Sequence, residues 1–375
     1  MRFLKAATRA PRRAALAALC AAGLLAALPT QAQTPDKPLR KVRIAVATQV
    51  LNLTYPWLMM PVALDWWKQE GLDVEVLPVG GSLQAVQMMV AGSVDFAQLN
   101  SSAIVQANAM NNVPVRAVMQ NGVVDWSLVT LESSPITTPQ QFKGKTIGVF
   151  NLASGGNHFL RAYLANNGLD PNRDIQLVAT GAGAPALEAL RSGRVQGLMF
   201  WGSMIANFEN QGAKLRYFRD PAWGGYPDYT LSALQGTIDK DPTLVEKIAR
   251  GAARATVFAM ASPDCVRRIH WARWPETRAS GAPDEATAIA WDLNSLKAQL
   301  QSMRDAYASN GGKLWGYTTP AAFGKMQDFM RDARLIDKAV DPASFVISRP
   351  GFFEAINDFD HKAVEEQARS CAMAQ

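Results

Sequence analysis

The sequence predicts an α/β protein built from two similar sheet-and-helix lobes that face each other across a cleft. Apolar residues that alternate as in strands are repeatedly followed by helical periodicity, which is typical of a largely parallel sheet. One strand–loop–helix pattern also occurs twice at a constant offset. Its landmarks pair as Gly80 with Gly181, Ala85 with Ala186, Gly92 with Gly193, and Val94 with Val195. A duplicated α/β lobe explains both the strand–helix alternation and the repeated landmarks.

Residues 1–32 predict a secretory signal peptide that is cleaved near Ala32, so we expect a periplasmic protein. A basic segment precedes an apolar run over 14–28, which is shorter than the ~20 residues that span a bilayer. The pair Arg12-Arg13 leaves both the general and the twin-arginine export routes open. The formal net charge of +6 is largely due to this segment, so it does not indicate nucleic-acid binding. Its basic residues are Arg2, Lys5, Arg9, Arg12 and Arg13.

The first lobe is predicted over 33–131, and the chain returns to it over 229–375. A strand over 41–47 leads through a loop into a helix that begins at Pro61 and ends before Gly71, because proline suits the first helical turn and glycine the C-terminal end. A strand follows over 72–77, with Val74 and Val76 on one face. A helix, a strand over 94–99, a helix over 101–110 and a strand over 115–120 complete this part.

The second lobe is predicted over 132–228. A polar, proline-bearing crossing over 132–139 leads into a strand over 145–150 and a helix over 154–166, and the return crossing follows at 219–228. Residues 230–235 are predicted as a strand that rejoins the first lobe. The remaining chain is predicted as helices over 242–261, 284–307 and 320–332, a scaffold on the first lobe. Leu293, Leu296 and Leu300 recur there at helical spacing, which is typical of packing.

Ligands of open parallel sheets bind beyond the carboxyl ends of the strands, where the N-termini of helices gather. This rule selects six loops, at 49–57, 80–82, 100–102, 151–157, 180–183 and 201–203, and none of them contains Asp, Glu, Lys or Arg. From these loops we select fourteen candidate ligand-binding residues. They are Gln49, Tyr55, Trp57, Gly81, Ser82, Asn100, Ser101, Ser154, Gly155, Gly156, Asn157, Thr180, Gly181 and Trp201.

The composition of these loops favours a small anion or a neutral polar ring as ligand. Glycines allow the backbone close to a ligand, and the free N–H groups of a first helical turn attract negative charge. The aromatic side chains offer apolar walls, and the absence of carboxylates disfavours a cationic head group. The alternative is that these Ser, Thr, Asn and Gly residues simply cap helices.

Motifs for catalysis, metal or cofactor binding are weak, so we predict neither an enzyme nor a cofactor. The three histidines, at 158, 270 and 361, have no metal-binding spacing. Gly181-x-Gly183-x-x-Ala186 imitates a dinucleotide fingerprint but lacks the acidic residue about 20 positions further on. An exported enzyme that uses His158 and Ser154 remains an alternative.

Cys265 and Cys371 are an even pair in a chain that is predicted to be exported, which favours a disulfide. The alternative is two buried thiols. Neither cysteine lies near a histidine in a pattern typical of a nucleophile.

Several segments, in this order and spacing, resemble the nitrate/sulfonate/taurine and thiamine-precursor solute-binding proteins of ABC importers. The segments are Gln-Glu-Gly-Leu-Asp-Val-Glu-Val at 69–76, Gly-Gly-Ser at 80–82, Ala-Gly-Ser-Val-Asp-Phe-Ala at 91–97, Phe-Lys-Gly-Lys-Thr-Ile-Gly-Val at 142–149 and Leu-Ala-Asn-Asn-Gly-Leu-Asp-Pro at 164–171. The resemblance covers about residues 41–235. It departs from the family at Gln196, at Trp66-Trp67 and in the additional stretch 262–283.

The resemblance implies a type II periplasmic-binding-protein fold, in which two lobes joined by two crossing segments close on a small molecule. It also implies a membrane permease as partner, a monomeric receptor and no nucleic-acid partner. A pyrimidine-type thiamine precursor is an alternative ligand, and a sensing role that reports occupancy to a membrane receptor is an alternative to transport. Nothing in the chain matches the cysteine-rich motif of the family's pyrimidine-synthase branch.

Overall fold

The computed structural model of the protein describes residues 38–371. The predicted signal peptide and its cleavage site near Ala32 lie outside the described residues. Every helix within 38–371 is too short or too polar to cross a bilayer.

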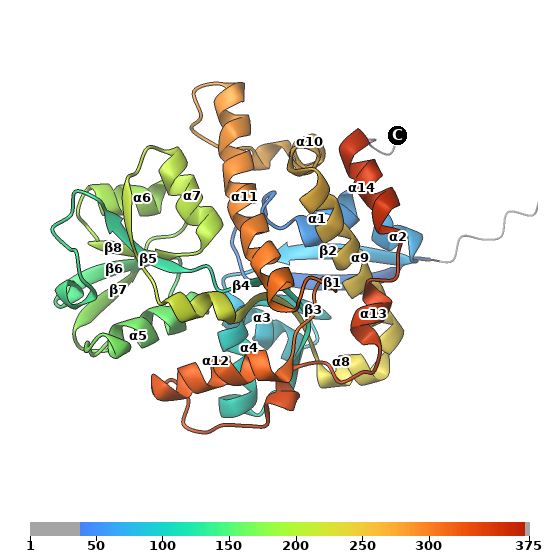
Figure 1. The fold of residues 1–375 in the computed structure, drawn as a ribbon, viewed down its shortest axis with the longest axis horizontal. Coiled ribbons are helices and arrows are strands. Elements are labelled where there is room, and N and C mark those ends of the chain that lie inside the picture. Colours follow the sequence, from blue (N-terminus) through green and yellow to red (C-terminus); the bar gives the residue numbers. More distant parts are fainter. Residues whose placement is uncertain (1–37, 372–375) are drawn as a thin grey trace, which may run out of the picture. The chain divides into compact units, whose positions relative to one another are not determined.

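The first sheet has the strand order β2-β1-β3-β10-β4 (Figure 1). Its strands are β1 (Arg40–Val46), β2 (Leu72–Pro78), β3 (Phe96–Leu99), β4 (Val115–Val123) and β10 (Pro227–Leu234). Strands β1, β2 and β3 are parallel, whereas β10 runs antiparallel to both β3 and β4. The residues Ile44, Ala45 and Val46 of β1 are all fully buried, as expected for a parallel strand that is covered on both faces.

The second sheet repeats this arrangement with the order β7-β6-β8-β5-β9. Its strands are β5 (Ser127–Leu131), β6 (Lys145–Val149), β7 (Ile175–Ala179), β8 (Gly197–Phe200) and β9 (Leu215–Phe218). Here too three parallel strands are followed by one antiparallel strand, β5, which pairs with β8 and β9. The prediction of two similar α/β lobes is therefore confirmed.

The first crossing between the sheets lies earlier than the sequence predicts. Residues 127–131 form β5 of the second sheet, so the chain crosses at 124–126 and not at 132–139. An apolar strand of this length fits either sheet, and its pairing partner is not encoded locally. The return crossing lies at 219–226 and contains the short helix η2 (Pro221–Gly225), and β10 begins at Pro227, before the predicted 230.

The helices of the first lobe are α1 (Pro56–Ala63), α2 (Trp66–Gln69), α3 (Ser82–Val90), α4 (Ser101–Asn111) and α8 (Gln235–Lys240). Helices α1, α3 and α4 follow the parallel strands β1, β2 and β3, whereas α2 follows α1 and α8 follows β10. Helix α1 begins at Pro56 rather than at the predicted Pro61, which lies inside it. A left-handed Asp65, with φ of 54°, separates α1 from α2, so the predicted single helix is two.

The second lobe contains α5 (Gly156–Asn166), α6 (Ala184–Arg191), α7 (Gly202–Asn210) and the short helix η1 (Pro139–Phe142). The C-terminal part forms α9 (Pro242–Ala261), α10 (Pro263–Arg273), η3 (Pro275–Thr277), α11 (Glu285–Ser309), α12 (Pro320–Asp332), η4 (Pro342–Phe345), α13 (Phe352–Ile356) and α14 (His361–Ser370).

This C-terminal part packs on both lobes, whereas the sequence predicts a scaffold on the first lobe alone. Helix α11 packs against β4 of the first sheet and α7 of the second lobe (Figure 1). Asn210 of α7 donates a hydrogen bond to the carbonyl of Trp291 in α11 at 2.9 Å. Phe329 of α12 lies 6.1 Å, between ring centroids, from Phe159 of α5. Amphipathic periodicity predicts a buried face but not which surface covers it.

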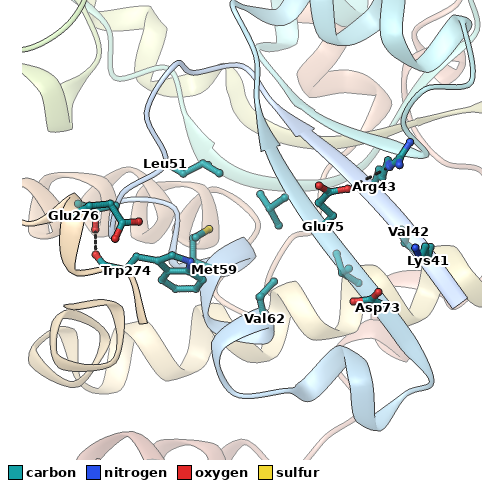
Figure 2. A pocket seen from close by; sticks show the side chains of 13 residues that line it. Lys41, Val42, Arg43, Leu51, Met59, Val62, Asp73, Glu75, Trp274 and Glu276 are labelled. Carbon is teal, nitrogen blue, oxygen red and sulfur yellow. Dashed lines mark hydrogen bonds and ion pairs between the residues drawn. The ribbon is translucent and has the colours of Figure 1, made fainter. Parts of the chain in front are cut away.

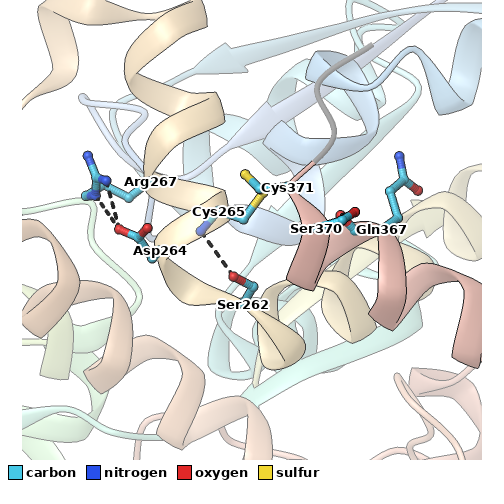
Figure 3. The surroundings of a disulfide bond; sticks show 7 residues. All are labelled: Ser262, Asp264, Cys265, Arg267, Gln367, Ser370 and Cys371. Atoms are coloured by element: carbon cyan, nitrogen blue, oxygen red, sulfur yellow. Dashed lines mark hydrogen bonds and ion pairs between the residues drawn. A yellow bond between two sulfur atoms is a disulfide. The ribbon is translucent and has the colours of Figure 1, made fainter.

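A disulfide joins Cys265 near the start of α10 to Cys371 directly after α14 (Figure 3). Ser262 caps α10, because its hydroxyl accepts a hydrogen bond from the backbone N–H of Cys265 at 3.3 Å. The bond ties the C-terminal helix to the α10 layer.

Candidate functional site

Two adjoining cavities lie between the lobes. The inner chamber has a volume of about 20 Å³, and the outer chamber has a volume of about 360 Å³. Tyr55 and Trp201 line both, so they form the boundary between the two. The inner chamber is lined by Ala47, Tyr55, Gly81, Ser82, Gln98, Asn100, Trp126, Phe150, Ser154, Gly155, Trp201 and Tyr229.

All six loops selected from the sequence contribute to one chamber or the other. Seven of the candidate residues line the inner chamber: Tyr55, Gly81, Ser82, Asn100, Ser154, Gly155 and Trp201. The outer chamber is lined by residues 48, 50 and 52–55, by 182–185 at the start of α6, by 201, 203, 204, 207 and 211 in and beside α7, by 276–280, and by Asp292 and Ser295 of α11. Residues 276–280 belong to the stretch that departs from the family pattern. The geometry therefore gathers the predicted loops around one cleft.

Two of the candidates, one polar and one aromatic, line neither chamber. Gln49 is exposed and lines neither chamber. The ring of Trp57 is fully buried and lies 6.0 Å from that of Tyr229, between centroids, so it supports the inner chamber from behind.

The remaining candidates shape the loops rather than line the chambers. Ser101 donates its backbone N–H to Asp228 at 3.3 Å, and a Cβ added to Gly156 would meet the ring of Trp126 at 2.2 Å. Asn157 donates to two carbonyls of its own loop. Thr180 donates its hydroxyl to the carbonyl of Val149 at 3.1 Å, and Gly181 turns the chain with φ of 72°.

Five helices begin beside the cleft. Helices α3, α4, α5 and α7 start within one or two residues of the inner-chamber residues Gly81, Asn100, Gly155 and Trp201, and α6 starts at the outer chamber. The first turn of a helix carries N–H groups without intrahelical partners. The cleft therefore combines backbone donors with aromatic walls.

The aromatic walls pack on one another. The rings of Trp126 and Trp201 are 5.4 Å apart, and those of Phe150 and Trp201 are 5.6 Å apart, between centroids. The indole N–H of Trp126 is buried without a hydrogen-bond partner among the described residues. A buried donor of this kind is costly, and a bound molecule would remove that cost.

The lobes touch at the rim of the inner chamber. The side-chain amide of Asn151 donates to the carbonyl of Gly80, and Ser102 donates to the carbonyl of Gly155 at 3.1 Å. A Cβ added to Gly155 would lie 2.5 Å from Asn100 Oδ1, so only glycine allows this approach. The structure is thus a closed arrangement of the two lobes.

Asp228, in the return strand β10, is a site residue that the sequence does not single out. Its carboxylate accepts two hydrogen bonds from the side-chain amide of Asn100, at 3.1 and 3.0 Å. It is fully buried. Burial raises its pKa to about 7, and the hydrogen bond from Asn100 acts in the opposite direction.

A second carboxylate, that of Asp125, lies in the first crossing. Tyr229 donates its hydroxyl to Asp125 Oδ1 at 2.8 Å, and a Cβ added to Gly202 at the start of α7 would lie 2.6 Å from Oδ2. Burial raises the pKa of Asp125 to about 6, while the Tyr229 hydrogen bond acts against the rise. Tyr229 adopts a left-handed φ of 50°, which is rare for a bulky residue and marks a constrained site.

The six loops are free of charge, as the sequence shows, but other segments bring acidic side chains to the cleft. Asp125 of the first crossing and Asp228 of β10 lie behind the inner chamber, and Glu276 and Asp292 line the outer chamber. The strand-end rule covers loops that follow parallel strands, whereas Asp125 precedes an antiparallel strand and Asp228 lies inside one. A search of the predicted return crossing at 219–228 for acids would have found Asp228, whereas Asp125 lies before the predicted first crossing at 132–139.

No hydrogen bond joins His158 and Ser154, the residues of the alternative enzyme, in the part of the chain that the structure describes. Burial lowers the pKa of His158 to about 4, and its Nδ1 has no partner among the described residues. The hydroxyl of Ser154 accepts a hydrogen bond from the backbone N–H of Gly156 at 3.4 Å. Within residues 38–371, no group of three or more His, Cys, Asp or Glu side chains could hold a metal ion.

A hollow of about 610 Å³ lies away from the cleft, over β1 and β2 (Figure 2). Met59, Val62 and Trp274 form its apolar side, and Arg43 pairs with Glu75 at 3.3 Å along the strands. None of the fourteen candidate residues lines it.

Two lobes of matching topology that close over a shared cleft define a protein with the periplasmic-binding-protein fold. The chain belongs to the family described as NMT1/THI5 like, whose model matches residues 58–265. The family resemblance predicted from the sequence is thereby confirmed.

Solved structures support the fold. A protein from Bordetella bronchiseptica RB50 is 22% identical with a TM-score of 0.64, over 86% of this chain and 98% of that one. The alkanesulfonate-binding protein SsuA from Xanthomonas axonopodis pv. citri, bound to MOPS, is 16% identical with a TM-score of 0.60, over 83% and 99%. The desulfurization enzyme DSZB is 14% identical with a TM-score of 0.53, over 84% and 99%, so the fold also occurs in an enzyme.

A sequence relative is the tetrathionate sensor histidine kinase TtrS of Salmonella typhimurium. It is 29% identical over 249 residues, which is 62% of this chain and 38% of TtrS. The chain thus spans about two fifths of that relative's length.

Proposed function

We propose that this protein is the periplasmic substrate-binding component of an ABC importer. In this role it captures a small anionic or neutral polar organic solute, of the sulfonate, nitrate or carboxylate type, and delivers it to a membrane permease. The observation that carries the proposal is that six loops from two lobes gather around one closed cleft lined by Tyr55, Asn100 and Trp201.

The geometry supports capture by closure. Contacts such as that between Ser102 and Gly155 join the lobes only when they are closed. A ligand that touches both lobes binds the closed form better than the open form, and it shifts the population by that difference in affinity. Related proteins of the same fold bind sulfonates, as the name of the Xanthomonas protein states, which supports this ligand class.

Thermal unfolding of the purified protein with a panel of compounds tests the proposal. A ligand that binds only the folded state adds RT ln(1 + [L]/Kd) to the free energy of unfolding. We expect at least one compound among sulfonates, nitrate, small carboxylates and pyrimidines to raise the Tm in a concentration-dependent way. Pyrimidines are included because a thiamine precursor is the alternative ligand, and the aromatic walls suit a planar ring. The absence of any shift would contradict the proposed ligand class.

A sensing role is a second candidate, because the chain is similar to part of the sensor kinase TtrS. The same closing cleft serves transport and sensing. Genes for a permease and an ATPase beside the gene of this protein would support transport, and genes for a sensor kinase there would support sensing. An exported enzyme is a weaker alternative, and it would require turnover that is lost in His158→Ala.

A further inference from the structure

The two chambers of the cleft differ in size, so they take different parts of a solute. The inner chamber, of about 20 Å³, holds little more than one water-sized group. The outer chamber, of about 360 Å³, has the size of a small-ligand pocket. A solute that places one terminal group among the helix N-termini of the inner chamber therefore keeps its body in the outer chamber. The side chains of the outer chamber then decide which body fits.

Helix α7 presents a polar face to the outer chamber. Ser203, Asn207 and Gln211 line the chamber, and residues four apart lie on the same side of a helix. Gln211 donates to the side-chain oxygen of Asn207 at 2.9 Å, so these two amides partly satisfy each other. Ser203 is only 4% exposed, and its hydroxyl has no hydrogen-bond partner within residues 38–371. A group bound in the chamber would provide that partner.

Helix α11 presents a second polar face to the same chamber. Asp292 and Ser295 lie about one turn apart and line the chamber, although they are only 6% and 7% exposed. Helices α7 and α11 pack on each other (Figure 1), and Asn294 donates to Asn210 Oδ1 at 2.8 Å. The hydroxyl of Ser295 forms no hydrogen bond with a described residue. The chamber thus lies between polar faces of the second lobe and of the C-terminal part.

Asp292 is held in place with one oxygen left for a ligand. Its Oδ2 accepts hydrogen bonds from Trp271 Nε1 at 2.6 Å and from the backbone N–H of Ala279 at 3.4 Å. Its Oδ1 accepts none from the residues that the structure describes. Trp271 and Ala279 both belong to the stretch 262–283, which departs from the family pattern. This stretch therefore supports an acceptor that faces the cleft.

Charges of both signs already line the outer chamber, which favours a neutral group beside Asp292. Arg278 lines the chamber together with Asp292 and Glu276. The guanidinium of Arg278 lies 4.6 Å from the ring centroid of Trp271, the residue that donates to Asp292. A cationic group would meet Arg278, and an anionic group would meet two carboxylates. A hydroxyl avoids both repulsions, because it is neutral and both donates and accepts hydrogen bonds.

We propose that the outer chamber is a subsite for a hydroxyl group of the solute, held by Asp292 and Ser295 of α11 and by Ser203 of α7. The solute is then a hydroxylated organic anion. Its anionic end accepts hydrogen bonds in the inner chamber, and its hydroxyl donates to Asp292 Oδ1 and accepts from a serine. This proposal rests on the proposed solute-binding function and narrows its ligand class. A hydrogen bond to a carboxylate is stronger than one between neutral groups, so Asp292 provides most of the selectivity.

A matched set of synthetic compounds tests the subsite by calorimetry. The compounds are alkanesulfonates and alkanoates with chains of about two to six carbons, which carry a methyl, hydroxyl, ammonium or carboxylate group at the far end. At the best chain length, we expect the hydroxyl compound to bind at least about tenfold more tightly than the other three, which corresponds to about 1.4 kcal/mol. Equal or tighter binding of the methyl, ammonium or carboxylate compound overturns the subsite and leaves the solute-binding function standing.

Variants locate the effect in the outer chamber. Asp292→Asn keeps the shape and an oxygen for Trp271 but removes the charged acceptor, and Ser295→Ala takes its place if that variant does not fold. We expect the advantage of the hydroxyl compound over the methyl compound to fall at least about fivefold in Asp292→Asn, and in Ser295→Ala if it is used. Affinity for the methyl compound should stay the same. Asp305→Asn, which removes an exposed carboxylate of the same helix, is the matched control. An unchanged advantage in the tested variant contradicts the proposal.

If none of these compounds binds, the solute itself decides. The protein is incubated with an extract of its expression host, desalted and examined by native mass spectrometry, and the captured molecule is identified. A hydroxylated molecule that Ser295→Ala retains at least about fivefold less supports the proposal. A molecule without a hydroxyl, or one that the variant retains equally well, overturns it. Failure to capture any small molecule contradicts the solute-binding function and the subsite together.

Discussion

Both carboxylate oxygens of Asp228 accept hydrogen bonds from a single side-chain amide, that of Asn100, at 3.1 and 3.0 Å. These hydrogen bonds join β10 to the N-terminus of α4, so the strand that follows the return crossing fixes the orientation of a cleft residue. It also places a titratable group behind the cleft, next to Asp125, whose negative charge raises the pKa of Asp228 further.

The stability of the ligand-free protein depends on pH through Asp228. Its pKa is raised from 3.8 to about 7 by burial, so the folded state holds this proton more tightly than the unfolded state does. Its contribution to stability is therefore fully present near pH 4 and is lost as the pH rises to about 7. We expect the Tm of Asp228→Asn minus the Tm of wild type to increase from pH 5 to pH 8 in thermal scans. If this difference stays constant over the range, the raised pKa of Asp228 is contradicted.

The stability of the protein also depends on pH through His270, with the opposite sign. Burial lowers its pKa from 6.5 to about 4, and neither ring nitrogen has a partner among the described residues. The folded state resists protonation, so stability is lost as the pH falls from about 6.5 toward 4. We expect the Tm of wild type to fall further than that of His270→Phe when the pH is lowered from 7 to 5. His361→Gln, at the start of α14, serves as the control and should follow wild type.

The disulfide between Cys265 and Cys371 is expected to stabilise the C-terminal layer. It closes a loop with a sequence separation of 106 residues, for which the chain-entropy model predicts roughly 4–5 kcal/mol. Denaturant unfolding of Cys265→Ser/Cys371→Ser should show a loss of roughly this size, and a reductant should lower the stability of wild type alone. Equal stability of the double variant and wild type would show that the bond does not contribute.

Gly155 controls lobe closure. A methyl group there would lie 2.5 Å from Asn100 Oδ1, so Gly155→Ala should keep the lobes apart. We expect ligand affinity to fall about tenfold or more, with a small change in the Tm of the ligand-free protein. Gly224→Ala is the matched control, because an added Cβ there meets no atom within 4 Å. If both variants bind equally well, closure at Gly155 is not required for binding.

The duplicated landmarks were the most informative part of the sequence. Gly80 and Gly181 stand in the loops after β2 and β7, at equivalent places of two sheets with matching strand orders. Gly92 and Gly193, which follow the next helices, both adopt a left-handed φ, of 68° and 73°. The rule that ligands bind at strand ends then selected Tyr55, Asn100 and Trp201, all of which line the inner chamber. Local sequence specifies these features, so they could be predicted.

Other features depend on tertiary partners. Residues 127–131 alternate as a strand, but their pairing with β8 and β9 is decided by the assembled sheet. Trp57 has the aromatic character of a ligand wall, yet it is fully buried behind the chamber. Asp125 comes from the first crossing and Asp228 from the antiparallel strand β10, and the strand-end rule applies to neither. Burial and hydrogen-bond partners of such residues emerge only when both lobes are assembled.

The most direct test of capture between the lobes is to lock them together. Gly80→Cys and Asn151→Cys replace two residues that touch across the cleft, and oxidation should bond them. Native mass spectrometry then follows the uptake of a solute from a host-cell extract. We predict that protein locked before exposure takes up no solute, and that protein locked after exposure retains its solute through dialysis. Equal loading and equal loss in both orders of treatment would contradict binding in the cleft.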